Sequence, residues 1–353
     1  MVMEYVETRT PATEPIALHV PSAGDELPVL ERHGLLYGSS KEMRRLYRLL
    51  DKVAPTDATV LIIGETGAGK ELVAHTIHQS SNRATQPFIV INCGAIPANL
   101  IEAELFGHER GSFTGAVRTH KGCFERAAGG TIFLDEITEM APEMQVKLLR
   151  VLESGSLRRV GGDQEIEASV RVIAATNRQP EVAVAQGQLR EDLLYRLSVF
   201  PVVVPPLRER GDDIVLLARL FLDELNREAG TEKAFSAAAL RYLRAHSWPG
   251  NVRELKNTIH RAFIMAGREV DLSVAVAVPA CGTPQAAGDA LTFAVGTPLA
   301  EAERQLIFAT LNRYQGNKKK TAEVLGVSLK TLYNRLTEYR ANGNGSALAR
   351  LNG

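Results

Sequence analysis

Short apolar runs alternate with segments of helical periodicity between residue 37 and about residue 206. The apolar runs lie at 59–63, 88–92, 131–134, 170–174 and 199–204. Strands that are apolar at every position are buried on both faces, which is typical of a parallel sheet covered by helices. The pattern therefore predicts an α/β domain over residues 36–207.

Outside this region the pattern changes. Residues 208–270 contain only helical patterns, at 213–228, 237–245 and 252–266, and predict a small helical domain. Residues 271–298 are rich in Ala, Gly and Pro and favour a linker. Residues 299–340 are helical again. We expect an acidic, proline-broken tail at 1–35 and a second tail at 341–353 to be disordered.

Composition limits the class of protein. Hydrophobic residues make up 45% and charged residues 23% of the chain, as is usual for soluble globular proteins. Its cysteines, Cys93, Cys123 and Cys281, are isolated, which argues against a disulfide framework and favours a reducing compartment. No apolar run approaches the roughly 20 residues of a spanning helix, and no signal peptide is evident. We expect a cytoplasmic protein with no membrane partner.

A glycine-rich loop follows the first predicted strand. Its residues are Gly64, Glu65, Thr66, Gly67, Ala68, Gly69, Lys70 and Glu71. Such a loop turns backbone N–H groups onto phosphates at a helix N-terminus, and the lysine reaches the β- and γ-phosphates. The general motif has Ser or Thr after the lysine. Glu71 stands there instead, so the hydroxyl ligand of Mg²⁺ is missing and the motif by itself is weaker.

Two carboxylates end a later strand. Asp135 and Glu136 follow the apolar run 131–134, which places them beside the glycine-rich loop at the carboxyl edge of the sheet. In phosphoryl transfer such a pair could hold Mg²⁺ (Asp135) and polarise the attacking water (Glu136). His75 and His78 lie three residues apart without a third ligand, so packing explains them better than a second metal site.

A third segment lies between these two. It reads Gly111, Ser112, Phe113, Thr114, Gly115 and Ala116, and suits an exposed loop tip. The segment resembles the GAFTGA signature of sigma-54-dependent transcription activators, the bacterial enhancer-binding AAA+ proteins, with Ser112 in place of the usual Ala. That family is also similar in carrying Glu at the position of Glu71.

The resemblance covers about residues 36–268 and implies an AAA+ P-loop ATPase core with a helical lid, which uses ATP and Mg²⁺. It implies that Asn92 pairs with the catalytic Glu136 and that Asn177 is sensor I. Arg190 and Arg196 resemble arginine fingers that reach a neighbouring subunit, and Arg253 resembles sensor II. The family further implies a homo-oligomeric ring, a hexamer, whose 111–116 loop contacts sigma-54 RNA polymerase with help from a second loop near 154–162.

The C-terminal segment is locally basic although the whole chain has a net charge of zero. Patterns at 304–314, 318–325 and 329–339, with a turn at Gly326 and Ser328 as a helix cap, predict a helix-turn-helix. It resembles the Fis-type module that ends sigma-54 activators. The second helix would expose Lys330, Thr331, Asn334 and Arg335 to the major groove, while Lys318, Lys319 and Lys320 would contact phosphates.

These patterns predict an ATP-dependent activator that binds upstream DNA and remodels closed sigma-54 polymerase complexes into open ones. Two alternatives are a DNA-binding regulator with a vestigial ATPase and another kind of AAA+ remodelling machine. Phe113, Thr114 and both acids argue against the first, and the helix-turn-helix argues against the second. Only about 35 residues precede the ATPase, so we expect no N-terminal regulatory domain and a regulatory protein that acts in trans.

Overall fold

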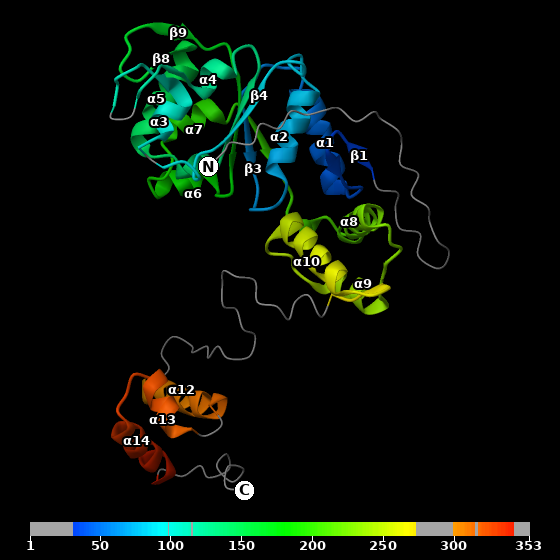
Figure 1. The fold of residues 1–353 in the computed structure, drawn as a ribbon, viewed down its shortest axis with the longest axis vertical. Coiled ribbons are helices and arrows are strands. Elements are labelled where there is room, and N and C mark those ends of the chain that lie inside the picture. The colour runs from blue at the N-terminus through cyan, green and yellow to red at the C-terminus, as the bar shows by residue number, and fades with distance from the viewer. Residues whose placement is uncertain (1–30, 98, 114–115, 273–298, 315–316, 342–353) are drawn as a thin grey trace. The chain divides into compact units, whose positions relative to one another are not determined.

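The computed structural model describes residues 31–97, 99–113, 116–272, 299–314 and 317–341 (Figure 1). The chain divides into two compact units, Met1–Val278 and Pro279–Gly353. Residues 1–30 and 342–353 of the expected tails, and 273–298 of the expected linker, lie outside the described residues. None of the helices in the described ranges is long and apolar enough to cross a membrane.

A five-stranded sheet forms the centre of the first unit. In spatial order its strands are β11 (Phe200–Val203), β3 (Val60–Ile63), β10 (Arg171–Thr176), β7 (Thr131–Asp135) and β4 (Phe88–Asn92). All neighbouring strands are parallel. The predicted α/β class is therefore confirmed, and each apolar run forms one strand whose bounds differ from the expected ones by no more than one or two residues.

Both faces of the sheet are covered by helices (Figure 1). Helices α1 (Lys41–Val53) and α2 (Lys70–Gln79) pack on the face that carries Val60, Ile62 and Phe133. Leu61, Ile132 and Leu134 point to the other face. The helices there are α3 (Ile101–Phe106), α4 (Cys123–Arg126), α5 (Pro142–Ser154), α6 (Pro180–Ala185) and α7 (Glu191–Leu197). Burial on two sides explains why the strands are apolar at successive positions.

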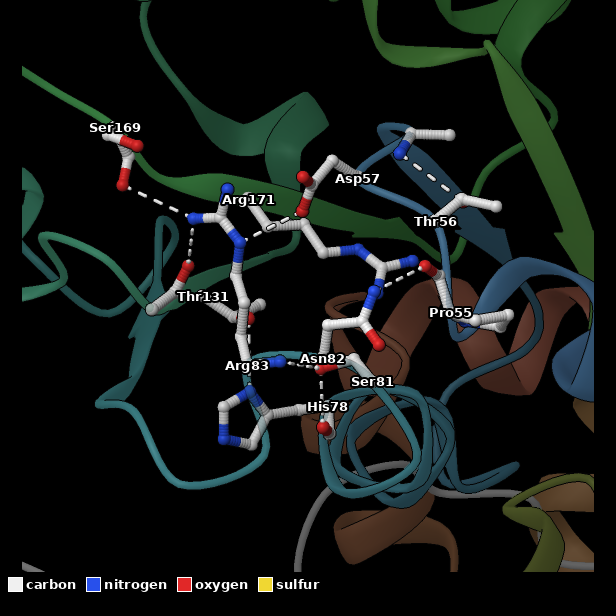
Figure 2. Close-up of polar contacts among 12 residues, drawn as sticks. Pro55, Thr56, Asp57, His78, Ser81, Asn82, Arg83, Thr131, Ser169 and Arg171 are labelled. Atoms are coloured by element: carbon white, nitrogen blue, oxygen red, sulfur yellow. Dashed lines mark hydrogen bonds and ion pairs between the residues drawn. The ribbon is translucent and has the colours of Figure 1, made fainter.

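Two arginines fasten the amino edge of the sheet (Figure 2). Arg171, only 1% exposed, donates from Nη1 and Nη2 to the carbonyls of Ala54 and Val53, just after and at the end of α1. Arg83 donates to the carboxylate of Asp57 and to the carbonyl of Ser169. The Arg171 bonds satisfy carbonyls that the end of α1 leaves unpaired, and the Arg83 bonds join two loops, so the polar cluster is structural.

Several short elements lie outside the main sheet. They are β1 (Arg32–His33), β2 (Leu36–Tyr37), β5 (Gly107–His108), β6 (His120–Lys121), β8 (Ser156–Arg158), β9 (Glu165–Glu167) and η1 (Ile137–Glu139). The three strand pairs β1–β2, β5–β6 and β8–β9 are antiparallel. Strand β1 begins at Arg32, four residues before the expected boundary at residue 36.

The helical lid follows the sheet in the same unit. It contains η2 (Leu207–Glu209), α8 (Asp213–Ala229), β12 (Ala234–Phe235), α9 (Ala237–Ala245), α10 (Asn251–Met265) and β13 (Glu269–Val270). Its apolar core is built around Trp248, which is 1% exposed, and extends to Leu272, two residues beyond the expected boundary. The three predicted helices are all present.

In its described residues, the second unit contains three helices, α12 (Leu299–Arg313), α13 (Lys318–Val324) and α14 (Leu329–Ala341). Ile307, Leu311 and Leu332 form its apolar core together with Ala322 and Leu336. The backbone N–H of Thr331 donates to Ser328 Oγ at 3.0 Å. The predicted helix-turn-helix and its serine cap are confirmed.

Candidate nucleotide site and its working surfaces

The glycine-rich loop lies at the carboxyl edge of the sheet, between β3 and α2. Helix α2 begins at Lys70. The Nζ of Lys70 donates to the carbonyls of Gly64 at 2.9 Å and Glu65 at 3.2 Å, so the ammonium group closes the loop from inside. The cation thus lies at the loop, where its positive charge favours an anion.

Asp135 ends β7 beside this loop, and Glu136 follows with a left-handed backbone, φ 53°. Burial lowers the pKa of Lys70, and the nearby charges of Asp135 and Glu136 act in the opposite direction. Burial raises the pKa of Asp135, opposed chiefly by the charge of Lys70. The three groups thus share one electrostatic environment, as expected of a phosphate and metal site.

Asn177 follows β10, the central strand of the sheet. Its Nδ2 donates to the hydroxyl of Thr66 in the glycine-rich loop at 3.2 Å. The neighbouring hydroxyl of Thr176 is buried and lies 3.4 Å from that of Thr138. The structure therefore brings Asn177 to the loop, as its place after the strand predicts.

Asn92 ends β4 and pairs in register with Asp135, but its side chain does not do what we expected. Its Oδ1 accepts hydrogen bonds from the N–H groups of Gly94 at 2.9 Å and Ala95 at 3.0 Å. No hydrogen bond joins it to Glu136, although both residues lie in the described part of the chain. The carboxylate of Glu136 instead lies against the turn, since a methyl group on Gly94 would stand 3.0 Å from its Oε2. An Asn side chain readily closes such a local turn.

Arg253 lies in the first turn of α10, directly against the glycine-rich loop. Its backbone N–H donates to the carbonyl of Gly67 at 3.3 Å. Gly67 has φ +76°, and a methyl group there would clash with the carbonyl of Gly250 and lie 3.0 Å from Cβ of Arg253. Close packing of the lid therefore requires glycine at this position of the loop.

Three further residues join the lid to the loop, and no sequence pattern predicted them. Arg208 donates twice to the carboxylate of Glu65, at 2.6 and 2.9 Å. Asn251 donates to Glu65 Oε2 and to the Thr66 carbonyl, and Arg210 donates to the Ala68 carbonyl. The Arg208 and Asn251 bonds lower the pKa of Glu65 to about 2. Only the position of Asn251, two residues before Arg253, could have drawn attention to it.

Arg196 lies on α7, and Arg190 directly precedes this helix. Neither side chain contacts the glycine-rich loop of its own chain. Arg190 pairs with Asp192 at 2.7 Å. Arg196 donates twice to the carbonyl of Leu152 in α5 and lines a cavity together with Thr59, the residue before β3. The loop follows the other end of β3, so Arg196 lies at the opposite edge of the sheet.

The segment 111–116 projects from the β5–β6 pair. Phe113 is 40% exposed, and its ring lies edge-on to that of His108, with centroids 4.9 Å apart. The hydroxyl of Ser112 is buried and has no hydrogen-bond partner among the described atoms. Thr114 and Gly115 lie outside the described residues. The exposed phenyl ring agrees with a loop tip.

A second loop, between β8 and β9, supports the base of this segment. Arg159 donates to the carboxylates of Glu109 and Glu125, each at 2.8 Å. The N–H of Glu109 donates to the carbonyl of Val160, and Gly161 packs on Ser112. Because of these contacts, a displacement of the β8–β9 loop would also displace the segment 111–116, and the reverse holds as well.

In the second unit the expected DNA contacts lie on α13 and α14. Six of them are exposed, namely Lys318, Lys319, Lys320, Lys330, Thr331 and Asn334. Arg335 is half-buried and pairs with Glu303 of α12 at 3.2 Å. The buried Leu332 and Leu336 lie on the opposite side of α14, which leaves a polar face for contact with a partner.

Known protein families match the sheet domain and the lid of the first unit and the helix-turn-helix of the second. Residues 36–203 match the sigma-54 interaction domain, 208–276 match an AAA+ ATPase lid domain, and 298–339 match the bacterial regulatory protein Fis family.

Whole proteins are also similar to the chain. The nitrogen fixation protein AnfA of Azotobacter vinelandii is 47% identical over 86% of this chain and 57% of its own length. The transcriptional regulatory protein FlbD of Caulobacter vibrioides is 44% identical over 90% of this chain and 72% of its own length. The regulatory protein AtoC of Escherichia coli is 43% identical over 87% and 68%, respectively. The chain thus spans little more than half of AnfA.

Among solved structures, NtrX from Brucella abortus in complex with ATP is similar with a TM-score of 0.65 and 36% identity. The match covers 86% of this chain and 69% of NtrX. Taken with the parallel sheet, the lid and the helix-turn-helix, these matches show that the chain belongs to the sigma-54-dependent transcription activators, with an AAA+ ATPase domain and a Fis-type DNA-binding domain.

Proposed function

We propose that this protein is an ATP-driven activator of transcription that acts on sigma-54 RNA polymerase. Its second unit binds upstream DNA, and its first unit hydrolyses ATP to move the 111–116 loop. The observation that carries this proposal is the convergence of Lys70, Asp135 and Asn177 at one edge of the sheet, in a chain that also has the loop segment. The family membership and the nucleotide-bound relative support it.

The proposed chemistry is in-line attack of water on the γ-phosphate. Lys70 and the loop N–H groups bind the phosphates, Glu136 orients and polarises the water, and Asn177 lies near the γ-phosphate. Arg253 approaches the nucleotide from the lid, and Glu71 is in the first turn of α2. We propose that Asn92 restrains Glu136 by pairing with it in another state of the cycle.

A magnesium ion fits this site through Asp135. Mg²⁺ in phosphate sites is held by one or two carboxylates together with substrate phosphates and waters. No cluster of three or more His, Cys, Asp or Glu suited to a metal occurs within the described ranges. The ion would neutralise phosphate charge, and Asp135 would hold it.

We propose that the subunits form a ring, a hexamer by family resemblance, in which Arg190 and Arg196 act on the ATP of a neighbour. The position of Arg196 at the opposite edge of the sheet from its own glycine-rich loop supports this. A regulatory protein that acts in trans stays a prediction of the sequence, and no contact in the described residues bears on it.

The deciding experiment is transcription in a purified system. The protein, sigma-54 polymerase and a promoter with an upstream site should give open complexes with ATP. They should give none with a non-hydrolysable analogue or with a promoter read by another sigma factor. Activation that does not depend on hydrolysis would contradict the proposal and favour a DNA-binding regulator with a vestigial ATPase.

A further inference from the structure

Four consecutive residues of the glycine-rich loop are each held by a residue of the segment 205–253. The pairs are Glu65 with Arg208 and Asn251, the Thr66 carbonyl with Asn251, the Gly67 carbonyl with Arg253 N–H, and the Ala68 carbonyl with Arg210. The phosphate-facing loop is thus fastened along its outer side by the lid and the residues that lead into it.

These bonds fix the direction of the peptide planes in the loop. In a trans peptide the N–H of one residue points opposite to the carbonyl of the residue before it. Since the carbonyls of Thr66 and Ala68 accept bonds from the lid side, the N–H groups of Gly67 and Gly69 point away from the lid. Backbone N–H groups with a common direction form an anion-binding site.

The hydrogen bonds between the loop and the lid differ in how easily they can break. Arg210 is buried, 4% exposed, and also donates to the Pro205 carbonyl, so removing it would leave carbonyls unpaired away from water. The side chains of Arg208 and Glu65 are 44% and 40% exposed. A solvated ion pair is only marginally stable, so this pair can open without damage to the fold.

We propose that the Arg208–Glu65 pair, with Asn251, is a latch through which the lid sets the conformation of the phosphate-binding loop. Glu65 and Arg208 are positioning residues for ATP. When the latch is closed, the loop N–H groups point to the phosphates. When the lid is displaced, the latch opens and the affinity of the loop for the nucleotide falls. The inference rests on the proposed nucleotide site and adds that lid position controls nucleotide affinity.

A double-mutant cycle on the full-length protein tests the latch. Arg208→Ala and Glu65→Ala should each raise KM for MgATP and the dissociation constant for ADP about three- to fivefold, since an exposed pair contributes that much. Turnover at saturation should stay within about twofold of the wild type. The double variant should be no weaker than the worse single one, and Arg208→Lys should recover part of the affinity because it keeps the charge.

The chain offers a matched control. Arg44 and Glu31 form a similar pair, bonded at 2.6 and 3.1 Å, with side chains 53% and 45% exposed, at a distance in sequence from the loop and lid. The same cycle there should leave KM unchanged. Multiplicative single effects at Arg208 and Glu65, or effects equal to those of the control, would overturn the latch. A wild type that binds ADP but fails at the promoter would contradict the proposed function alone.

Discussion

Lys70 and Glu136 stand close together but are proposed to do different work, so single substitutions should separate binding from turnover. Lys70→Ala removes a charge-assisted phosphate contact and should weaken ATP binding. Glu136→Gln keeps the shape and should retain ATP affinity while lowering turnover by about 10²–10⁴, because an amide cannot act as a base. Calorimetry and steady-state hydrolysis measure the two quantities. Wild-type turnover in Glu136→Gln would refute the assignment.

His78 makes stability depend on pH. It is 5% exposed, bonded to the Thr131 hydroxyl at 3.0 Å (Figure 2), and burial, then the charge of His75, lowers its pKa to about 4. In the unfolded chain the His78 imidazole binds a proton as the pH falls through about 6.5, whereas in the folded protein it does so only near its lowered pKa of about 4. Stability is therefore unaffected above that pH and falls as pH drops toward 4, by about 2 kcal/mol between pH 7.5 and 5.

Urea denaturation at the two pH values checks this, with His78→Gln as the test variant. The variant should lose about 2 kcal/mol of the wild-type difference. His260→Gln is the matched control, because His260 is exposed on α10. If His78→Gln retains the whole wild-type difference, the buried imidazole is not its source.

At the scale of elements, the 111–116 loop should be separable from the ATPase. Thr114→Ala should leave hydrolysis within about twofold and abolish promoter activation, if the loop tip touches only the sigma factor. Ser112→Ala should stay active in both assays, because the Ser112 hydroxyl is buried without a partner in the described structure and its loss costs little. Loss of hydrolysis in Thr114→Ala would place the loop in the catalytic core.

Helix α7 gives a second test at this scale. An arginine that acts on a neighbour's ATP can contribute about 10³–10⁵ in rate. Arg196→Ala and Lys70→Ala subunits should each be nearly inactive, and mixtures should recover turnover at interfaces that join an intact loop to an intact arginine. Activity that neither recovers on mixing nor rises with wild-type concentration would favour catalysis within single subunits.

The elements show what the sequence could and could not predict. Each strand of the sheet follows from its own apolar run, because burial on two faces marks it locally. The strands β5, β6, β8 and β9 have only two or three residues, too few for a periodic signal. The bonds of Glu65 to Arg208 and Asn251 join residues 143 and 186 positions apart, so only the packed lid reveals them.

The same limit applies to Asn92, whose pairing with Glu136 stays a prediction. Its place at the end of the second apolar run was predictable from the sequence, whereas its register beside Asp135 is known only from the structure. The competition between a distant carboxylate and two N–H groups of its own turn was not, since it depends on side-chain geometry.

At the scale of the whole molecule, the two compact units should work independently at the level of binding. The second unit has its own apolar core, so deleting 299–353 should leave the ATP affinity of the first unit unchanged while site-specific DNA binding is lost. Binding curves for a labelled upstream site and for ADP measure both effects. Tight site-specific binding by the shortened protein would show that DNA recognition lies elsewhere.

Within the second unit, we expect some residues to contact base edges and others to contact phosphates. Lys330 and Asn334 are exposed on α14 and suited to base edges, so Asn334→Ala should cost about 1–3 kcal/mol and relax specificity at one base pair. Lys319→Ala on α13 should weaken binding evenly across sequences and reduce the slope of log affinity against log salt by about one. Two copies should bind half-sites about 34 Å apart, or a multiple of that spacing, if the module dimerises as a helix-turn-helix does. Equal losses at specific and random DNA for Asn334→Ala would mean that α14 contacts only the phosphate backbone.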